Sequence, residues 1–222
     1  MPIARDVFRT THPRTYQELR GDIRNGDMLL CSGHGAFSRM IQMATWSNWS
    51  HVGFIFRLDD IDRIMVLESV ERAGVRAIPL SVLVDGNGKS RSPYRGRLAI
   101  ARHAAFNEAV SPEKMKQMTQ FALDRLATGY DMSEVMKIAA RIMLGAFRIR
   151  VPGVLRPDDE YICSEYAYEC YRHIGVEIPG HPLGFVAPSD FARCEHVDLV
   201  GVVKTRASPK RIRAPRAARV QA

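Results

Sequence analysis

The feature that most constrains this chain is a cysteine placed where a polar loop passes into an amphipathic helix. Cys163 follows the acidic stretch 158–160 and precedes the helical pattern of residues 164–171. A helix N-terminus carries partial positive charge and unpaired N–H groups, which favour a thiolate over a thiol. Far upstream, His51 opens one strand pattern and Glu68 lies in another. Cysteine, histidine and carboxylate on separate elements are typical of a cysteine hydrolase.

The composition is that of a globular domain with a basic appendage. The chain has 222 residues, and its 46% hydrophobic and 25% charged content suits one domain of ordinary size. Seven of the 32 basic residues follow position 203, which leaves 25 of them against 24 acidic ones in the rest. We therefore expect an N-terminal leader with a short helix over 1–22, a hydrolase domain over 23–204, and a disordered basic tail over 205–222.

The four cysteines at 31, 163, 170 and 194 show no regular pairing, so we expect thiols in a reducing compartment. No Cys-x-x-Cys or His-x-x-x-His pair occurs, so we expect neither a metal site nor a cofactor. Neither a secretory signal nor a membrane span is evident, which favours a cytoplasmic location, with export by another route left open.

The chain divides into a strand-rich half and a helical half. We expect strands at 28–31, 51–56, 64–70, 97–102 and 196–204, with the second and third forming an antiparallel pair, and an extended segment at 75–84. We expect helices at 15–24, 36–45, 111–127, 131–147, 163–175 and from 188.

The order of Gly26-Asp27, Ser50-His51-Val52-Gly53, Glu68, Gly129-Tyr130-Asp131 and Cys163-Ser164-Glu165 resembles the circularly permuted papain-like hydrolases, the YiiX-like relatives of the NlpC-type cell-wall peptidases. In ordinary papain-like enzymes the cysteine precedes the histidine, whereas here the histidine strand comes first. The resemblance covers roughly residues 23 to 203. It implies an α+β fold in which a small antiparallel sheet packs against the helix that bears the nucleophile.

The resemblance implies that Cys163 is the nucleophile, that His51 is the general base, and that Glu68 orients the imidazole. The backbone N–H of Cys163 would then be an oxyanion donor. Whether His51 and Glu68 share a face depends on a hairpin register that the sequence leaves open by one residue.

Residues beside the two key positions are candidate substrate contacts: Trp49, Ser50, Tyr161 and Ser164. Trp49 fits a core position equally well. Cys194-Glu195-His196 resembles the Cys-Glu-His of lecithin:retinol acyltransferase-type enzymes. However, Cys194 closes a short helix instead of opening one, and that context does not favour a thiolate.

These observations predict a cysteine amidohydrolase or peptidase that acts through an acyl-enzyme on amide or acyl substrates, with peptidoglycan peptides as one class. One rival is an acyltransferase or lipid hydrolase of the lecithin:retinol acyltransferase type, and another is a non-catalytic binding or virion-associated module. The basic tail lacks aromatic residues, so it predicts contact with an anionic surface and no specific nucleic acid. The oligomeric state is left open.

Overall fold

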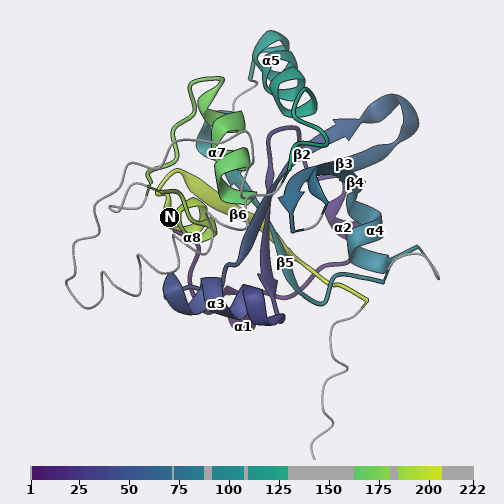
Figure 1. Ribbon diagram of the computed structural model, residues 1–222. Coiled ribbons are helices and arrows are strands. Elements are labelled where there is room, and N and C mark those ends of the chain that lie inside the picture. The colour runs from purple at the N-terminus through teal and green to yellow at the C-terminus, as the bar shows by residue number, and fades with distance from the viewer. Residues whose placement is uncertain are drawn as a thin grey trace, which may run out of the picture.

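A six-stranded antiparallel sheet forms the centre of the computed structural model, which describes residues 2–71, 73–87, 92–107, 110–129, 163–180 and 185–206. The strands follow the spatial order β4-β3-β2-β1-β5-β6, so β1 and β2 are central and β4 is an edge (Figure 1). Their bounds are β1 Met28–Gly33, β2 His51–Leu58, β3 Arg63–Val70, β4 Gly74–Pro79, β5 Gly96–His103 and β6 Val197–Val203. The predicted pairing of β2 with β3 is confirmed.

Helices cover both faces of this sheet. They are α1 Val7–Thr10, α2 Tyr16–Leu19, α3 Ala36–Ala44, α4 Leu80–Asp85, α5 Pro112–Leu123, α7 Cys163–Arg172 and α8 Pro188–Arg193, with short 3₁₀ turns at Asp59–Ile61 and Ala104–Phe106. Figure 1 shows α5 and α7 on one side of the sheet and α2 and α4 on the other. The central strands are therefore apolar on both faces, as β1 shows with six consecutive buried residues.

Two hydrophobic clusters result, one on each face. The first joins α7 and α5 to alternate residues of β2, among them Tyr171 and Phe54. The second joins α2 and α4 to the remaining strand residues, among them Leu19 and Val66. The sheet is thus the middle layer of a three-layer core.

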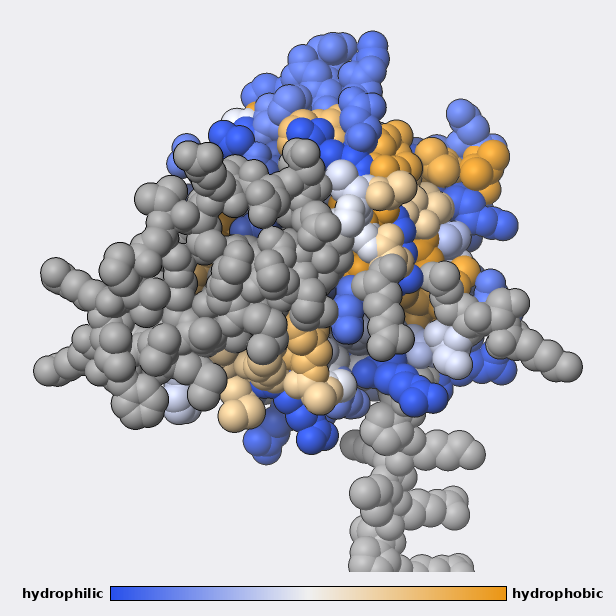
Figure 2. All heavy atoms as spheres, in the orientation of Figure 1, coloured by the Kyte–Doolittle hydropathy of each residue, from blue (hydrophilic) through white to orange (hydrophobic). Residues whose placement is uncertain are grey.

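A few large apolar side chains remain at the surface. Met43 and Trp46, at the end of α3, are 75% and 78% exposed, and Ile61 is 62% exposed. Figure 2 shows apolar side chains among charged ones on the right of the described surface. Apolar atoms contribute much of any folded surface, so single exposures of this kind need no special explanation.

The structure corrects the expected segment 75–84. The strand β4 ends at Pro79, and residues 80–85 form α4 instead of continuing the extended chain. Leu80, Leu83 and Val84 are buried at a helical spacing, which is the pattern that the extended assignment overlooked. The helix expected at 131–147 lies outside the described residues, as does the tail from 207.

The N-terminal residues pack on the domain. The N–H of Ile3 donates to the carbonyl of Ala192 at 2.8 Å, Val7 is 3% exposed, and Leu19 is fully buried. These contacts show that the segment described as a leader contributes to the core. The domain boundary at residue 23 stays a prediction. None of the described helices has the length and apolarity needed to cross a membrane.

A tight turn before β1 fixes the sheet to α7. Gly26 has φ +85°, a conformation that side chains disfavour, and its carbonyl accepts a 2.8 Å hydrogen bond from the Tyr171 hydroxyl of α7. A Cβ added at Gly26 would lie 2.2 Å from the ring of Phe106. The turn therefore requires glycine for two independent reasons.

We expect Gly26→Ala to lower the free energy of unfolding by more than about 1 kcal/mol, because a side chain is both strained and crowded at this position. Gly21→Ala is the matched control, since a Cβ there meets no atom within 4 Å. Chemical denaturation of both variants measures the difference. Equal stability of the two variants would contradict the close packing of the turn.

Candidate active site

Cys163 is the first residue of α7, and the packing of that helix fixes its position. Its side chain is buried, with 4% of the residue exposed. Two tyrosines of α7 anchor the helix: the Tyr166 hydroxyl donates to the carbonyl of Ala122 at 2.8 Å, and Tyr171 donates to the turn at Gly26. The thiol is therefore held at a helix N-terminus, where backbone N–H groups point toward added negative charge.

His51 is the first residue of β2 and lies opposite Cys31 of β1 in the sheet. Its Nε2 lies 2.7 Å from Oε2 of Glu68. The ring also interacts electrostatically with the side chain of Cys163, which helps to raise the pKa of His51. Because Nε2 faces Glu68, Nδ1 is the ring nitrogen left for the sulfur. The imidazole thus lies between the thiol and the carboxylate.

Glu68 is 3% exposed and is held from both neighbouring strands. Its direct partner in register on β4 is Arg76, whose Nε and Nη2 donate to Oε1 at 3.0 Å and 2.6 Å. On the β2 side, a Cβ added at Gly53 would lie 2.7 Å from Cγ1 of Val66 and 3.2 Å from the carbonyl oxygen of Leu67, so β2 packs closely against β3 beside Glu68.

The electrostatics of the site favour an imidazolium beside a carboxylate. Burial lowers the pKa of His51, but the charge of Cys163, a hydrogen bond to that side chain, and the bond to and charge of Glu68 together raise it to about 10. Burial raises the pKa of Glu68, but His51 and Arg76 outweigh burial, and the net pKa is lowered. Each of the two groups thus stabilises the charged form of the other.

Two further residues beside the site, Arg76 and Tyr94, are not among the expected site residues. The Tyr94 hydroxyl forms a hydrogen bond with Ser50, the residue before His51, and burial is the main cause of its raised pKa. The Ser50 hydroxyl in turn accepts the N–H of Gly33 at 3.0 Å. Neither residue could be found by motif, because Tyr94 lies in a loop and the role of Arg76 depends on the β3–β4 register.

The structure places the expected substrate contacts as follows. Trp49 is 3% exposed and packs on Phe8, with ring centroids 5.1 Å apart. Ser50 and Ser164 are 3% and 1% exposed. Tyr161 lies outside the described residues. Contact of any of them with a substrate stays a prediction.

The other three cysteines are also buried and free. Burial raises the pKa of the Cys31 thiol well above its ordinary value and that of Cys170 to about 12. Cys194 ends α8 and donates its N–H to the carbonyl of Asp190. Of the four, Cys163 is the one that begins a described helix and interacts with an imidazole. No group of three or more metal-binding side chains occurs among the residues that the structure describes.

The fold described above is that of a papain-like cysteine hydrolase. The family model of the permuted papain-like amidases, the YaeF/YiiX or C92 family, matches residues 22–183. The chain belongs to this family, and the predicted α+β permuted papain-like fold and hydrolase class are confirmed.

Among solved structures, the chain resembles YiiX from Escherichia coli O157:H7, which is described as a metalloprotein. The TM-score is 0.56 at 19% identity, over 79% of this chain and 95% of that one. At this identity the likeness supports the fold alone. No curated protein matches the sequence.

We expect iodoacetamide at neutral pH to modify Cys163 before the other three cysteines in the folded protein. Cys31 and Cys170 keep their protons there because their pKa values are raised by burial. Peptide mapping after brief labelling measures the order of modification. His51→Ala is the companion variant and should slow labelling at Cys163, since the imidazole that stabilises a thiolate is removed. Faster modification of any other thiol would contradict the assignment.

Proposed function

We propose that this protein is a cysteine amidase or peptidase in which Cys163 is the nucleophile, His51 the acid–base group and Glu68 the residue that orients the imidazole. The observation that carries the proposal is the position of the His51 ring, which lies 2.7 Å from Glu68 and interacts electrostatically with Cys163 at the start of α7. Membership of the amidase family supports the reaction class.

Acylation would begin with attack of the Cys163 thiolate on the carbonyl carbon of the substrate. The C–S bond forms as the carbonyl π electrons move to oxygen, and the N–H groups at the start of α7 are suited to stabilise that oxyanion. When the tetrahedral intermediate collapses, the C–N bond breaks and the His51 imidazolium gives its proton to the leaving amine. A thioester and a neutral imidazole result.

Deacylation would use the same groups in reverse. The neutral His51 takes a proton from water, whose oxygen attacks the thioester carbonyl. Collapse of the second intermediate expels the sulfur of Cys163 and releases a carboxylic acid. Glu68 keeps its bond to the ring throughout, which holds the imidazole in one orientation and stabilises it when charged.

The substrate is proposed to be an amide or related acyl compound, and peptidoglycan peptides are one class to test. Acyl transfer to an acceptor other than water would use the same thioester, so assays should follow the fate of the acyl group as well as loss of the amide. Residues outside the described ranges separate α5 from α7, and they include the candidate contact Tyr161.

We expect Cys163→Ala and His51→Ala each to lower kcat by about four powers of ten, because each removes a group that takes part in bond making or proton transfer. Glu68→Gln should lower kcat less than either alanine variant, since it keeps an acceptor for the ring but loses the charge. Steady-state kinetics on a cleaved amide, with circular dichroism as a folding control, test this. Normal turnover of folded His51→Ala would rule out the mechanism.

We expect kcat/KM to fall as the pH rises through about 10, because His51 then loses the proton that it gives to the leaving group. The stability that this raised pKa contributes is complete below about pH 6.5 and is likewise lost as the pH passes about 10. Glu68→Gln should move the alkaline limb to lower pH, because the carboxylate that raises the pKa of His51 is gone. An alkaline limb at the same pH in Glu68→Gln and in the wild type would contradict the interaction between Glu68 and His51.

A further inference from the structure

The carboxylate of Glu68 has its two oxygens divided between two strands. Oε2 faces His51 of β2 at 2.7 Å, and Oε1 accepts both donors of Arg76 of β4 at 3.0 Å and 2.6 Å. The side chain of Arg76 is 30% exposed, whereas that of Glu68 is 4% exposed. The edge strand thus supplies a cation, reached from solvent, to a buried anion.

The contact with Arg76 holds the carboxylate of Glu68 in one orientation and also favours its ionised form. A guanidinium offers several N–H groups in one rigid plane, and two of them converge here on a single oxygen. Arg76 itself is held by the register of β4 with β3. The neighbouring Val75 exchanges backbone hydrogen bonds with Ala127 and Thr128 at 3.0 Å and 2.9 Å, which ties β4 down beside it.

We propose that Arg76 is a positioning residue of the hydrolase, which keeps Glu68 ionised and turned toward His51 throughout the catalytic cycle. This inference rests on the proposed function. Its physical reason is the change in charge of His51 during the reaction. Each time the imidazole is neutral, Glu68 loses one of its two cationic neighbours, and a buried carboxylate without a counterion takes up a proton.

The charged and titratable groups around Glu68 show why it needs Arg76 as a counterion when His51 is neutral. His51 of β2 and Arg76 of β4 are the cationic groups that lower its pKa. The thiol of Cys31 on β1 and the phenol of Tyr94 also face it, and both interact unfavourably with its charge when ionised. Cys163 of α7 completes the set through the shared contact with His51. Once His51 is neutral, Arg76 is the remaining cation of this group within the part of the chain that the structure describes.

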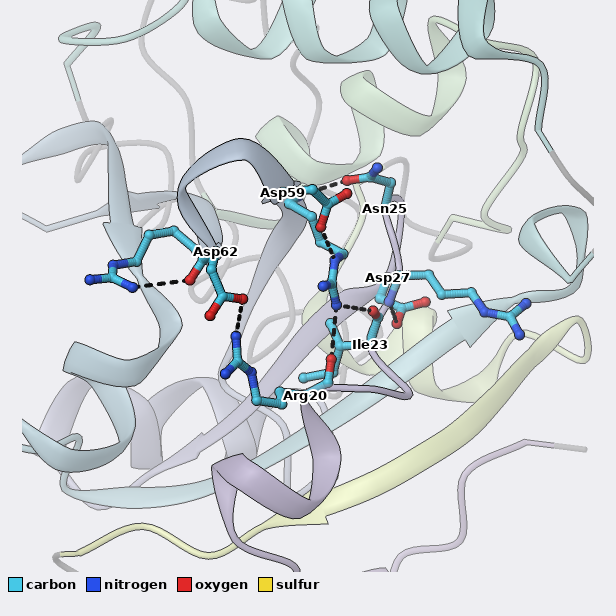
Figure 3. Close-up of polar contacts among 9 residues, drawn as sticks. Arg20, Ile23, Asn25, Asp27, Asp59 and Asp62 are labelled. Atoms are coloured by element: carbon cyan, nitrogen blue, oxygen red, sulfur yellow. Dashed lines mark hydrogen bonds and ion pairs between the residues drawn. The ribbon is translucent and has the colours of Figure 1, made fainter.

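The same sheet contains a second buried carboxylate–arginine pair, Asp27 and Arg102, which illustrates what a purely structural role for Arg76 would look like. Asp27 is fully buried and accepts from Arg102 at 2.6 Å and 2.8 Å. Figure 3 shows Asp27 beside Asn25 and Ile23. Among the described residues, this pair forms no hydrogen bond with His51 or Cys163. The test for Arg76 must therefore read out the state of the site and not stability alone.

The experiment measures the rate of iodoacetamide labelling of Cys163 as a function of pH in Arg76→Met, Arg76→Lys and wild type. The methionine keeps the apolar stem and removes the charge and the donors. In Arg76→Met we expect the pH at which labelling reaches half its maximal rate to rise by about one unit or more. Glu68 then protonates at a higher pH and no longer stabilises the imidazolium of His51. Labelling should approach the wild-type rate as the pH rises further.

Arg76→Lys should give a smaller shift, since it keeps the charge but loses the two-point contact. Arg57→Met is the matched control. Arg57 also lies on a strand of this sheet, its side chain is 24% exposed, and it binds Asp59 and backbone carbonyls away from Glu68, where Figure 3 shows Asp59 and Ile23. Its labelling profile should match wild type.

The double variant Glu68→Gln/Arg76→Met tests whether Arg76 affects the labelling of Cys163 through Glu68 or independently of it. If Arg76 works through the carboxylate, the double variant should label with the profile of Glu68→Gln alone. Additive shifts, or an Arg76→Met profile equal to wild type while Glu68→Gln is shifted, would overturn the inference and leave the proposed function standing. A profile unchanged in His51→Ala would instead count against the proposed function itself.

Should Arg76→Met fail to fold, Arg76→Lys carries the same test. Its profile must then lie between those of wild type and Glu68→Gln. A wild-type profile for a folded Arg76→Lys, combined with kcat and KM equal to wild type, would show that charge alone suffices and would overturn the positioning role.

Discussion

The buried carboxylate of Glu68 is the group on which the arrangement of the site depends. Removing an ionised carboxylate from water costs several kcal/mol unless partners surround it. His51 and Arg76 are those partners, one from each flanking strand, and both lie in hydrogen-bonding distance. Three adjacent strands are therefore tied together through one side chain. A shift of register in either pairing would leave the charge without a partner, so the site also specifies the register.

Burial alone does not distinguish the nucleophile from the other thiols. All four cysteines are buried, and Cys31 lies directly opposite His51 in the sheet. What sets Cys163 apart is its neighbours: a helix that begins with it and an imidazole that interacts with it. Cys31 lies within a strand whose N–H groups are engaged in the sheet, and burial raises the pKa of its thiol. The local supply of donors and positive charge, more than depth, selects the reactive sulfur.

Much of this fold could be predicted from the sequence because the strands are apolar and the turns carry clear signals. The sequence predicts His51 and Glu68 on neighbouring strands, but the residues leave open by one position the register that brings the two side chains together. The role of Arg76 also depends on strand register, since an arginine in a strand that ends at Pro79 has the same sequence pattern as a solvated surface charge. The extended segment expected at 75–84 does not include the helix α4, which begins after its N-cap residue Pro79.

The permuted chain order has a physical consequence for how the site is assembled. His51 and Glu68 belong to two strands joined by the short turn at Asp59–Ile61, and Arg76 follows on the next strand, so these three groups meet through local pairing. Cys163 comes from far along the chain and joins them only through the packing of α7, by contacts such as that of Tyr171 with Phe54. The imidazole and its counterion are thus set by the sheet, and the position of the thiol is set separately by the helix. Changes in the packing of α7 can therefore move the nucleophile while the histidine, the carboxylate and the arginine keep their mutual geometry.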